Sequence, residues 1–352
     1  MLHDHGCEVH VAAKDNLAEK NGLKLDFVDQ VFDIPFERSP FARQNITAYR
    51  QLKTIIDAGG YDVIHTNTPV GGIVGRLASK NIRKSGSKVF YTAHGFHFFK
   101  GGPKKNWILY YPIEKFMCRY TDTLISITDE DYQLSTQKFK VKTARIHGIG
   151  ANTQKYYSRT DDDCARLRTE LGYTPENRIL LCTGELNPNK NQITAIRAMQ
   201  KIVKDYPAAR LLLAGNGSTS DLLKQEAELL GLSEYVSLLG YRTDLEQFVN
   251  IADVIISCSK REGLPVNIIE GMLCGKPIVA SINRGHKELI DPDKNGYLVP
   301  AEDTEAFAKR IIELLMDDTK RTTFGIYGQN KAQSYTDTFV YHELEEIYGY
   351  LL

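Results

Sequence analysis

Two glutamates, Glu262 and Glu270, stand eight positions apart around the expected start of a helix. An apolar run at residues 253–257 precedes them and another at 277–281 follows, and each predicts a strand. Pro265 suits the first position of the intervening helix, where no helical bond uses the N–H. Glu262 is therefore expected on the loop at the carboxyl end of a strand, where open α/β sheets bind ligands.

The residue types around this helix start favour an anionic, hydroxyl-rich ligand. Backbone N–H groups of Gly263, Leu264 and their neighbours would face the strand end, and a helix N-terminus favours an anion such as a phosphate. Carboxylates accept hydrogen bonds from hydroxyl groups, which a ribose or a sugar supplies. The alternative interpretation is an ordinary strand–helix–strand unit with two solvated glutamates.

The whole stretch from Lys260 to Pro277, with its Pro and three Gly residues in place, resembles the motif of the retaining glycosyltransferases of family 4. The resemblance implies an α/β fold of the GT-B type, in which two Rossmann-like βαβ domains face each other across a cleft. It also implies that Glu262 contacts the sugar of a nucleotide-sugar donor and that Glu270 binds the ribose. The segment Gly263–Pro265 would then hold the donor diphosphate.

The turn after the predicted strand at 178–183 carries Gly184, Glu185 and Lys190. Family relatives place an Arg and a Lys here, and both grip the diphosphate. Lys190 matches, whereas Glu185 reverses the charge at the Arg position. Arg261, beside the first motif glutamate, is a candidate substitute. The alternative for Lys190 is a solvated side chain in a first helical turn, a position that the helix dipole mildly disfavours for a cation.

Further strand ends hold the other candidate residues. By resemblance, Gly215, Gly217 and Tyr241 line the nucleotide pocket, although turn glycines before a helix explain the first two equally well. By the same resemblance, His94, which follows a strand in the first half of the chain, is expected to contact the transferred sugar or the acceptor hydroxyl. A structural histidine is the alternative. Asn67 and His97 are expected on the acceptor side; a capping loop is the alternative for Asn67, and for His97 a structural role is equally open.

Length and composition fit two domains without nucleic-acid partners. The predicted domains are an acceptor-side domain at residues 1–155, to which a helix at 335–352 returns, and a donor-binding domain at 165–334. Residues 1–170 carry 25 Lys and Arg against 19 Asp and Glu, and residues 171–352 carry 19 against 25. The resulting charges, +6 and −6, are too mild to indicate nucleic-acid binding, and no such motif appears. Six scattered cysteines suit a reducing cytosol.

The start of the chain predicts an incomplete first sheet. Residues 1–13 resemble the end of a helix, a Gly6 cap and then a strand, whereas family members carry a first strand and most of a helix before this point. Either Met1 is an internal methionine of a longer natural chain, which we favour, or the chain is a true short form. In both cases the amino-terminal sheet should lack a strand.

A basic face is predicted on the helix that begins at Gly72. Its cations, with others that follow, are candidates for contact with anionic lipid: Arg76, Lys80, Arg83, Lys84, Lys88, Lys104 and Lys105. A merely solvated charge run is the alternative. The predicted location is the cytoplasm, with peripheral attachment at the inner face of the cell membrane left open.

The sequence thus predicts a retaining transferase of hexosyl or N-acetylhexosaminyl groups, with a UDP-sugar donor and a lipid-linked or saccharide acceptor in surface-polysaccharide assembly, such as capsule or exopolysaccharide. No cofactor or metal is expected, because Lys190 and a helix N-terminus supply positive charge where the leaving diphosphate develops. Two alternatives remain. Glu185 and the missing strand suggest a partner subunit that binds nucleotide or glycan without turnover, and a GT-B epimerase acting on a UDP-sugar would need no acceptor.

Overall fold

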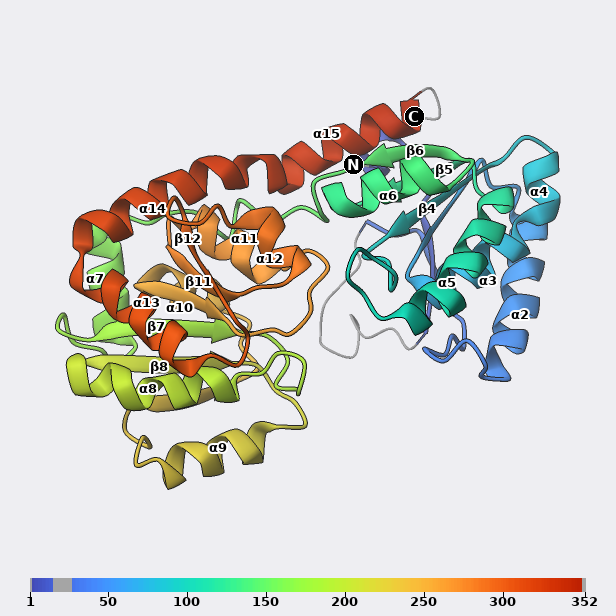
Figure 1. Ribbon diagram of the computed structural model, residues 1–352. Coiled ribbons are helices and arrows are strands. Elements are labelled where there is room, and N and C mark those ends of the chain that lie inside the picture. The colour runs from blue at the N-terminus through green and yellow to red at the C-terminus, as the bar shows by residue number, and fades with distance from the viewer. Residues whose placement is uncertain (1, 15–26, 350–352) are drawn as a thin grey trace. The chain divides into compact units, whose positions relative to one another are not determined.

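The computed structural model describes residues 2–14 and 27–349, and the chain divides into two compact units. Unit 1 comprises Met1–Gly148 together with Tyr341–Leu352, and unit 2 comprises Ile149–Val340. The described strands of both units pair in parallel, and helices alternate with them along the chain (Figure 1). This is the α/β architecture predicted from the sequence.

Unit 2 is a doubly wound six-stranded sheet with the strand order β12-β11-β10-β7-β8-β9. Its strands are β7 (Arg178–Thr183), β8 (Ala209–Ala214), β9 (Val236–Gly240), β10 (Val254–Ser257), β11 (Ile278–Ser281) and β12 (Gly296–Val299). Its helices are α7 (Asp161–Glu170), α8 (Ile193–Asp205), α9 (Ser220–Leu229), α10 (Leu245–Ile251), α11 (Val266–Leu273), α12 (Arg284–Leu289), α13 (Thr304–Met316) and α14 (Asp318–Ala332). The order reverses at β7 and β10, so the loops after these strands lie at a switch point of the sheet.

The two faces of this sheet bury separate cores because successive strand residues point to opposite sides. In β7, Leu180 packs with α8, α9 and α13, whereas its neighbours Ile179 and Leu181 pack with α10 and α11. All three side chains are fully buried. A near-continuous apolar strand is what a parallel sheet covered on both faces requires.

Unit 1 contains a four-stranded sheet of order β3-β4-β5-β6 and a separate pair, β1-β2. The strands are β1 (His10–Ala13), β2 (Gln30–Asp33), β3 (Val63–Asn67), β4 (Lys88–Ala93), β5 (Thr123–Ser126) and β6 (Lys142–Arg145). The helices are α2 (Gln44–Gly59), α3 (Pro69–Ala78), α4 (Lys80–Lys84), α5 (Lys104–Met117) and α6 (Asp129–Lys138). Short 3₁₀ turns occur at His3–His5, Cys118–Tyr120 and, in unit 2, Gln333–Tyr335.

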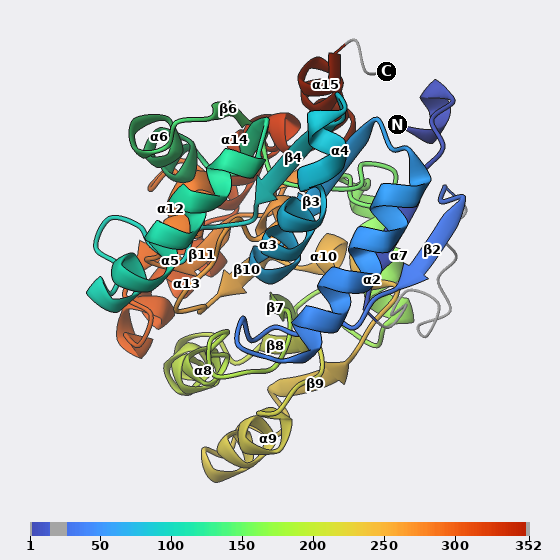
Figure 2. The ribbon, with the colours of Figure 1, turned by 90° about the vertical axis from the view of Figure 1, so that its right-hand side faces the viewer.

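The two sheets of unit 1 flank a cavity of about 520 Å³. Both β1 and β3 line it, and helices α2 and α3, which pack side by side (Figure 2), cover one side through Leu52 and Gly75. Ala12 of β1 and Ile64 of β3 contact the same apolar cluster on these helices. The described residues therefore show the incomplete first sheet that the sequence predicts.

Residues from Tyr341 onward, in helix α15 (Asp337–Tyr348), belong to unit 1. Glu343 accepts hydrogen bonds from the backbone N–H and the Nδ1 of His147, at 2.8 and 2.6 Å. The hydroxyl of Tyr348 lies 2.6 Å from His65 Nδ1 on β3. These polar contacts anchor the last helical turns to strand β3 and to the segment that follows β6.

The predicted basic face near Gly72 is wrong in part. Arg76 is fully buried, its guanidinium lies 3.8 Å from the centre of the Tyr91 ring, and its Nη2 donates to Glu114 at 3.0 Å. Arg83, further along, pairs with Asp122 at 2.9 Å. Because a buried guanidinium needs a carboxylate partner, Arg76 belongs to the interior of unit 1. Arg83 is half-buried and also pairs with a carboxylate, so neither arginine is a free surface cation.

Arg76→Met should destabilise unit 1 by about 3–5 kcal/mol, because Glu114 would stay buried without its cation. Urea unfolding followed by the fluorescence of Trp107, the single tryptophan, measures this loss. The double variant Arg76→Met/Glu114→Leu should recover most of it, and the exposed Lys80→Met should change little. An unchanged urea midpoint for Arg76→Met would show that the pair does not stabilise the fold.

Candidate active site

Three loops of unit 2 meet at the carboxyl edge of adjoining strands. They follow β7, β8 and β10, which are neighbours in the sheet. The β7 and β10 loops are tied directly, since the N–H of Lys260 donates to the Asn189 carbonyl at 2.8 Å and Asn189 Nδ2 donates to the Arg261 carbonyl at 3.0 Å. These bonds fix the position of residues 189–190 against residues 260–262.

The tie brings together two of the predicted catalytic residues. Lys190 Nζ donates to Glu262 Oε1 at 2.7 Å, and both side chains are largely buried. An ammonium group has three N–H donors, so this contact leaves Lys190 with further donors for an anion placed beside the carboxylate. Lys190 is therefore a positioned cation at a strand end and not a freely solvated side chain.

Glu185 does not occupy the place of a competing anion. Its side chain is exposed, and the carboxylate that pairs with Lys190 is Glu262. The backbone carbonyl of Glu185 accepts a hydrogen bond from Gln192 Nε2 at 3.1 Å. Arg261, the candidate substitute for the missing arginine, is exposed on the neighbouring loop.

The predicted glycines on these loops have a demonstrable packing role. A Cβ on Gly215 would lie 2.0 Å from the carbonyl oxygen of Gly184, and one on Gly217 would lie 2.1 Å from that of Leu186. Gly184 and Gly215 also adopt positive φ angles. Glycine is required at positions 215 and 217 because the β7 and β8 loops touch each other there. Tyr241, on the next loop, is 66 % exposed.

Helix α11 carries the second glutamate of the motif. It spans Val266–Leu273, and Pro265 is its extended N-cap and not the first helical residue that the sequence suggested. Gly263 and Leu264 lie on the loop just before it. The helix ends before Gly275, whose φ of 69° is the left-handed conformation expected of a helix end.

Burial raises the pKa of Glu270 to about 7, although its hydrogen bond with Tyr156 and the nearby charge of Lys155 oppose the rise. Burial likewise raises the pKa of the Tyr156 hydroxyl. Carboxyl groups whose pKa is shifted toward neutral pH are common in functional sites. Tyr156 was missed from the sequence because it lies in the polar stretch between the two predicted domains, residues 156–164.

A second residue missed from the sequence is His286, in α12. Its imidazole is fully buried and contacts Ser257 Oγ at 3.0 Å and the Ser281 carbonyl at 2.6 Å. Burial lowers its pKa to about 4, so the ring is neutral at pH 7. Gly285 beside it packs so closely that a Cβ would lie 2.4 Å from the Gly263 carbonyl, and α12 thereby supports the loop of Glu262.

In unit 1 the structure groups the predicted acceptor-side residues at the ends of β3 and β4. His94 Nε2 lies 3.0 Å from Asn67 Oδ1, and partial removal of water from the His94 ring lowers its pKa. Burial lowers the pKa of the adjacent His65 to about 4. His97 stacks on Tyr110 with ring centres 4.6 Å apart.

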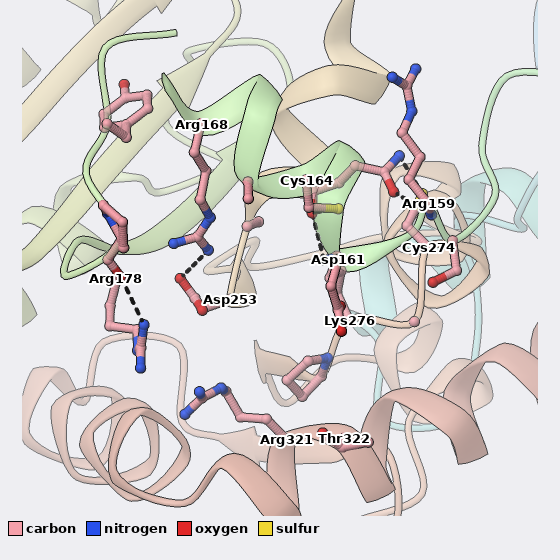
Figure 3. Close-up of a pocket in the computed structure, with 18 of the residues that line it drawn as sticks. Arg159, Asp161, Cys164, Arg168, Arg178, Asp253, Cys274, Lys276, Arg321 and Thr322 are labelled. Carbon is pink, nitrogen blue, oxygen red and sulfur yellow. Dashed lines mark hydrogen bonds and ion pairs between the residues drawn. The ribbon is translucent and has the colours of Figure 1, made fainter. Parts of the chain in front are cut away.

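A cavity of about 560 Å³ in unit 2 lies at the opposite, amino-terminal edge of the sheet. Figure 3 shows that Arg168 points toward Asp253, and the two pair at 2.8 Å. Arg321 in the same cavity donates to the Leu314 and Leu315 carbonyls. None of the predicted site residues lines this cavity, so it is separate from the loops described above.

Residues 2–14 and 27–349 contain neither a cluster of metal ligands nor a membrane-spanning helix. Nowhere in them do three His, Cys, Asp or Glu side chains gather in a way that could hold a metal ion. None of their helices combines the length and the apolar character that crossing a bilayer requires.

The raised pKa of Glu270 predicts a pH-dependent cost to stability. The unfolded chain ionises this group near pH 4.5 and the folded chain near 7, so stability falls as the pH rises between these values and stays low above them. Glu270→Gln should therefore raise the free energy of unfolding by about 2–3 kcal/mol at pH 8 and by little at pH 5. Urea midpoints at both pH values test this, with the exposed Glu228→Gln as control. If Glu270→Gln raised the free energy of unfolding equally at both pH values, burial of the ionised carboxylate would not be the cause of the gain.

Comparison with known proteins identifies the family. Residues 165–331 match the family model "Glycosyl transferases group 1", and residues 1–128 match "Glycosyl transferase 4-like". EpsD of Bacillus subtilis (strain 168), a protein named as a glycosyltransferase, is 42 % identical over 98 % of this chain and 89 % of its own. An Escherichia coli UDP-Gal:alpha-D-GlcNAc-diphosphoundecaprenol alpha-1,3-galactosyltransferase is 25 % identical over 86 % of this chain and 79 % of its own.

Solved structures share the fold. HepE from Anabaena in complex with UDP superimposes with a TM-score of 0.77 at 22 % identity, covering 97 % of this chain and 99 % of HepE. Sucrose-phosphate synthase from Thermosynechococcus elongatus gives 0.77 at 20 % identity, covering 99 % and 90 %. At such identities the likeness shows the fold alone, which is GT-B. The ion-paired strand-end loops and the two matched family models together place this chain in the group 1, family 4-like glycosyltransferases.

Proposed function

We propose that this glycosyltransferase transfers a hexosyl or N-acetylhexosaminyl group from a UDP-sugar, with retention of configuration, to a lipid-linked or saccharide acceptor of surface-polysaccharide assembly. The observation that carries the proposal is the Lys190–Glu262 ion pair at the carboxyl edge of β7 and β10. UDP is bound in the HepE crystal structure, and the E. coli relative is named for a UDP-sugar donor and a diphosphoundecaprenol-linked acceptor, which supports both substrate classes.

The donor site follows from the charges at this edge. Lys190 binds the diphosphate with its remaining N–H donors, and the backbone of Gly263–Pro265 before α11 adds dipoles of the same sign. Glu262 accepts hydrogen bonds from sugar hydroxyls while its contact holds Lys190 in place. Glu270 binds the ribose hydroxyls from α11. Arg261, Tyr241 and the glycines of the β7 and β8 loops border the same edge.

The reaction then depends on stabilising the departing diphosphate. The bond between the anomeric carbon and the diphosphate oxygen breaks, and negative charge grows on that oxygen beside Lys190. The acceptor oxygen bonds to the anomeric carbon from the same face, and its proton passes to the leaving diphosphate. Configuration is retained without a protein nucleophile. His94, positioned by Asn67, contacts the sugar or the acceptor hydroxyl on the unit 1 side.

The same arrangement supports metal-independent transfer, since an ammonium group and a helix N-terminus supply the charge that a divalent cation would otherwise contribute. Activity should therefore persist in excess EDTA with a rate within about twofold of the untreated enzyme. The measurement is nucleotide release from UDP-glucose and UDP-N-acetylglucosamine in the presence of an acceptor extract. Loss of activity that Mg²⁺ or Mn²⁺ restores would refute this part of the proposal.

A panel of nucleotide sugars, assayed with and without lipid-linked acceptor, tests the function itself. Acceptor-dependent release of UDP supports the transferase. Interconversion of the sugar without acceptor would instead indicate an epimerase, and binding without any turnover would indicate a partner subunit. The enzyme would remain in the cytoplasm or at the inner face of the membrane, where UDP-sugars and lipid-linked glycans meet.

Removing either member of the ion pair should abolish transfer. Lys190→Ala and Glu262→Gln are each expected to lower kcat about 100-fold or more, the loss typical of one electrostatic contact to developing charge. Lys201→Ala, which breaks an exposed ion pair with Glu305, is the matched control and should keep full activity. Circular dichroism checks that the variants fold. Near-normal kcat in both site variants would remove these residues from the mechanism.

A further inference from the structure

Unit 1 contains an apolar groove of about 540 Å³ that the donor-side chemistry does not use. It opens between the segment that precedes α2, the start of α3 and one side of α5. Its walls are aliphatic and aromatic side chains, among them Phe36, Phe41, Val70, Ile73, Leu109 and Ile113. Few polar groups line it. A surface of this kind normally becomes buried against an apolar ligand.

The mouth of the apolar groove is itself exposed to solvent. Phe41 is 81 % exposed, Leu109 is 42 % exposed, and Ile108, next to Leu109 on α5, is 77 % exposed. Soluble proteins seldom leave several large apolar side chains together in water without a partner. The first turn of α5 adds Lys104 and Lys105 and no acidic residue. Apolar side chains beside lysines are typical of a surface that rests at a lipid interface.

One end of the groove reaches the predicted acceptor-side residues. Thr68 and Gly95, which line it, directly follow Asn67 and His94 in the chain. His97 lines it too and stacks on Tyr110. A ligand lying in the groove would therefore place its end next to the His94–Asn67 contact, where the acceptor hydroxyl is expected.

The charges around the groove suit a hydrocarbon with an anionic end. Arg38 lines the groove. The two carboxylates that line the groove are already paired with cations, because Glu37 pairs with Lys14 and Glu114 pairs with Arg76. A peptide would need hydrogen-bond partners for its backbone, which this lining scarcely offers, whereas a hydrocarbon chain needs none.

We infer that the apolar groove binds the first isoprenoid units of a lipid diphosphate acceptor. The lipid chain lies along α5 and α3, and the diphosphate emerges toward Arg38 and the His94–Asn67 contact. This inference rests on the proposed function and narrows the acceptor from any saccharide to a lipid-linked one.

Trp107 provides a direct probe of the groove. It is the only tryptophan of the chain, and its ring centre lies 5.4 Å from that of Phe98, a groove residue. A dansyl-labelled geranylgeranyl diphosphate bound in the groove should quench Trp107 by energy transfer. Unlabelled geranylgeranyl diphosphate should displace it at concentrations at least tenfold lower than inorganic diphosphate. Equal displacement by the two competitors would show headgroup binding only and would overturn the inference.

Matched variants locate the site. Leu109→Glu places a carboxylate at the groove mouth and should weaken probe binding at least tenfold, whereas Leu229→Glu, on an 82 % exposed position of α9 in unit 2, should leave it unchanged. Ile73→Phe fills part of the groove without adding charge and should also weaken the probe. If both groove variants bind the probe normally, the groove is not the lipid site. If Leu109→Glu instead converts a dimer to a monomer with probe binding intact, the groove is a self-association surface and the inference fails.

A final variant separates this inference from the proposed function. Glu262→Gln should lose transfer and still bind the probe as the wild type does, because the residues that line the groove belong to unit 1. Leu109→Glu should bind UDP normally. A wild-type protein that binds the probe and transfers no sugar would refute the proposed function alone; one that transfers sugar to soluble saccharides and ignores the probe would refute the lipid groove alone.

Discussion

The contact between Lys190 and Glu262 joins two loops that are 72 residues apart in the chain, and the arrangement of the carboxyl edge of the unit 2 sheet depends on it. A buried or half-buried ammonium needs a nearby carboxylate, and a carboxylate in such a place needs a cation. Each residue therefore fixes the other. Under the proposed function, a diphosphate would bind where the positive charge of Lys190 is already in place, so its binding would require little reorganisation.

The support beneath the pair consists of tightly packed neutral groups. His286 is buried and uncharged, and Gly285 and Gly215 let loops approach at distances that any side chain would prevent. Glu270 differs from these neutral groups, because it ionises above neutral pH and its burial then lowers the stability of the folded protein. A group that destabilises the free protein and gains hydrogen bonds from a ligand is consistent with a binding role, since folding alone would favour an uncharged residue there.

Unit 1 uses charge differently. Arg76 and Glu114 form a buried pair that holds α3 and α5 together, so a cation that resembled a surface residue in the sequence belongs to the interior. The exposed side of the same helix α5 carries apolar groups in place of charges. Unit 1 thus buries a charged pair and exposes leucine, isoleucine and phenylalanine side chains. The inference that the groove binds a lipid rests on these exposed apolar side chains.

The sequence by itself determined the alternation of strands and helices, the strand-end positions of Glu262, Lys190, His94 and Asn67, and the incomplete first sheet. These features are local, because they depend on apolar periodicity, turn glycines and a short motif. Sequence placed Pro265 only to within one residue, since caps depend on backbone angles that periodicity does not specify.

Only the tertiary structure decided which of these residues meet. Several features of the site depend on contacts between residues distant in sequence or on the surroundings of one side chain. They are the pairing of Lys190 with Glu262, the hydrogen bond between Tyr156 and Glu270, the outward orientation of Glu185 and the buried position of Arg76. No pattern along the chain encodes such contacts. They arise because the strand order of the sheet brings separate loops to one edge. Burial then shifts the pKa of each ionisable side chain and so determines its charge.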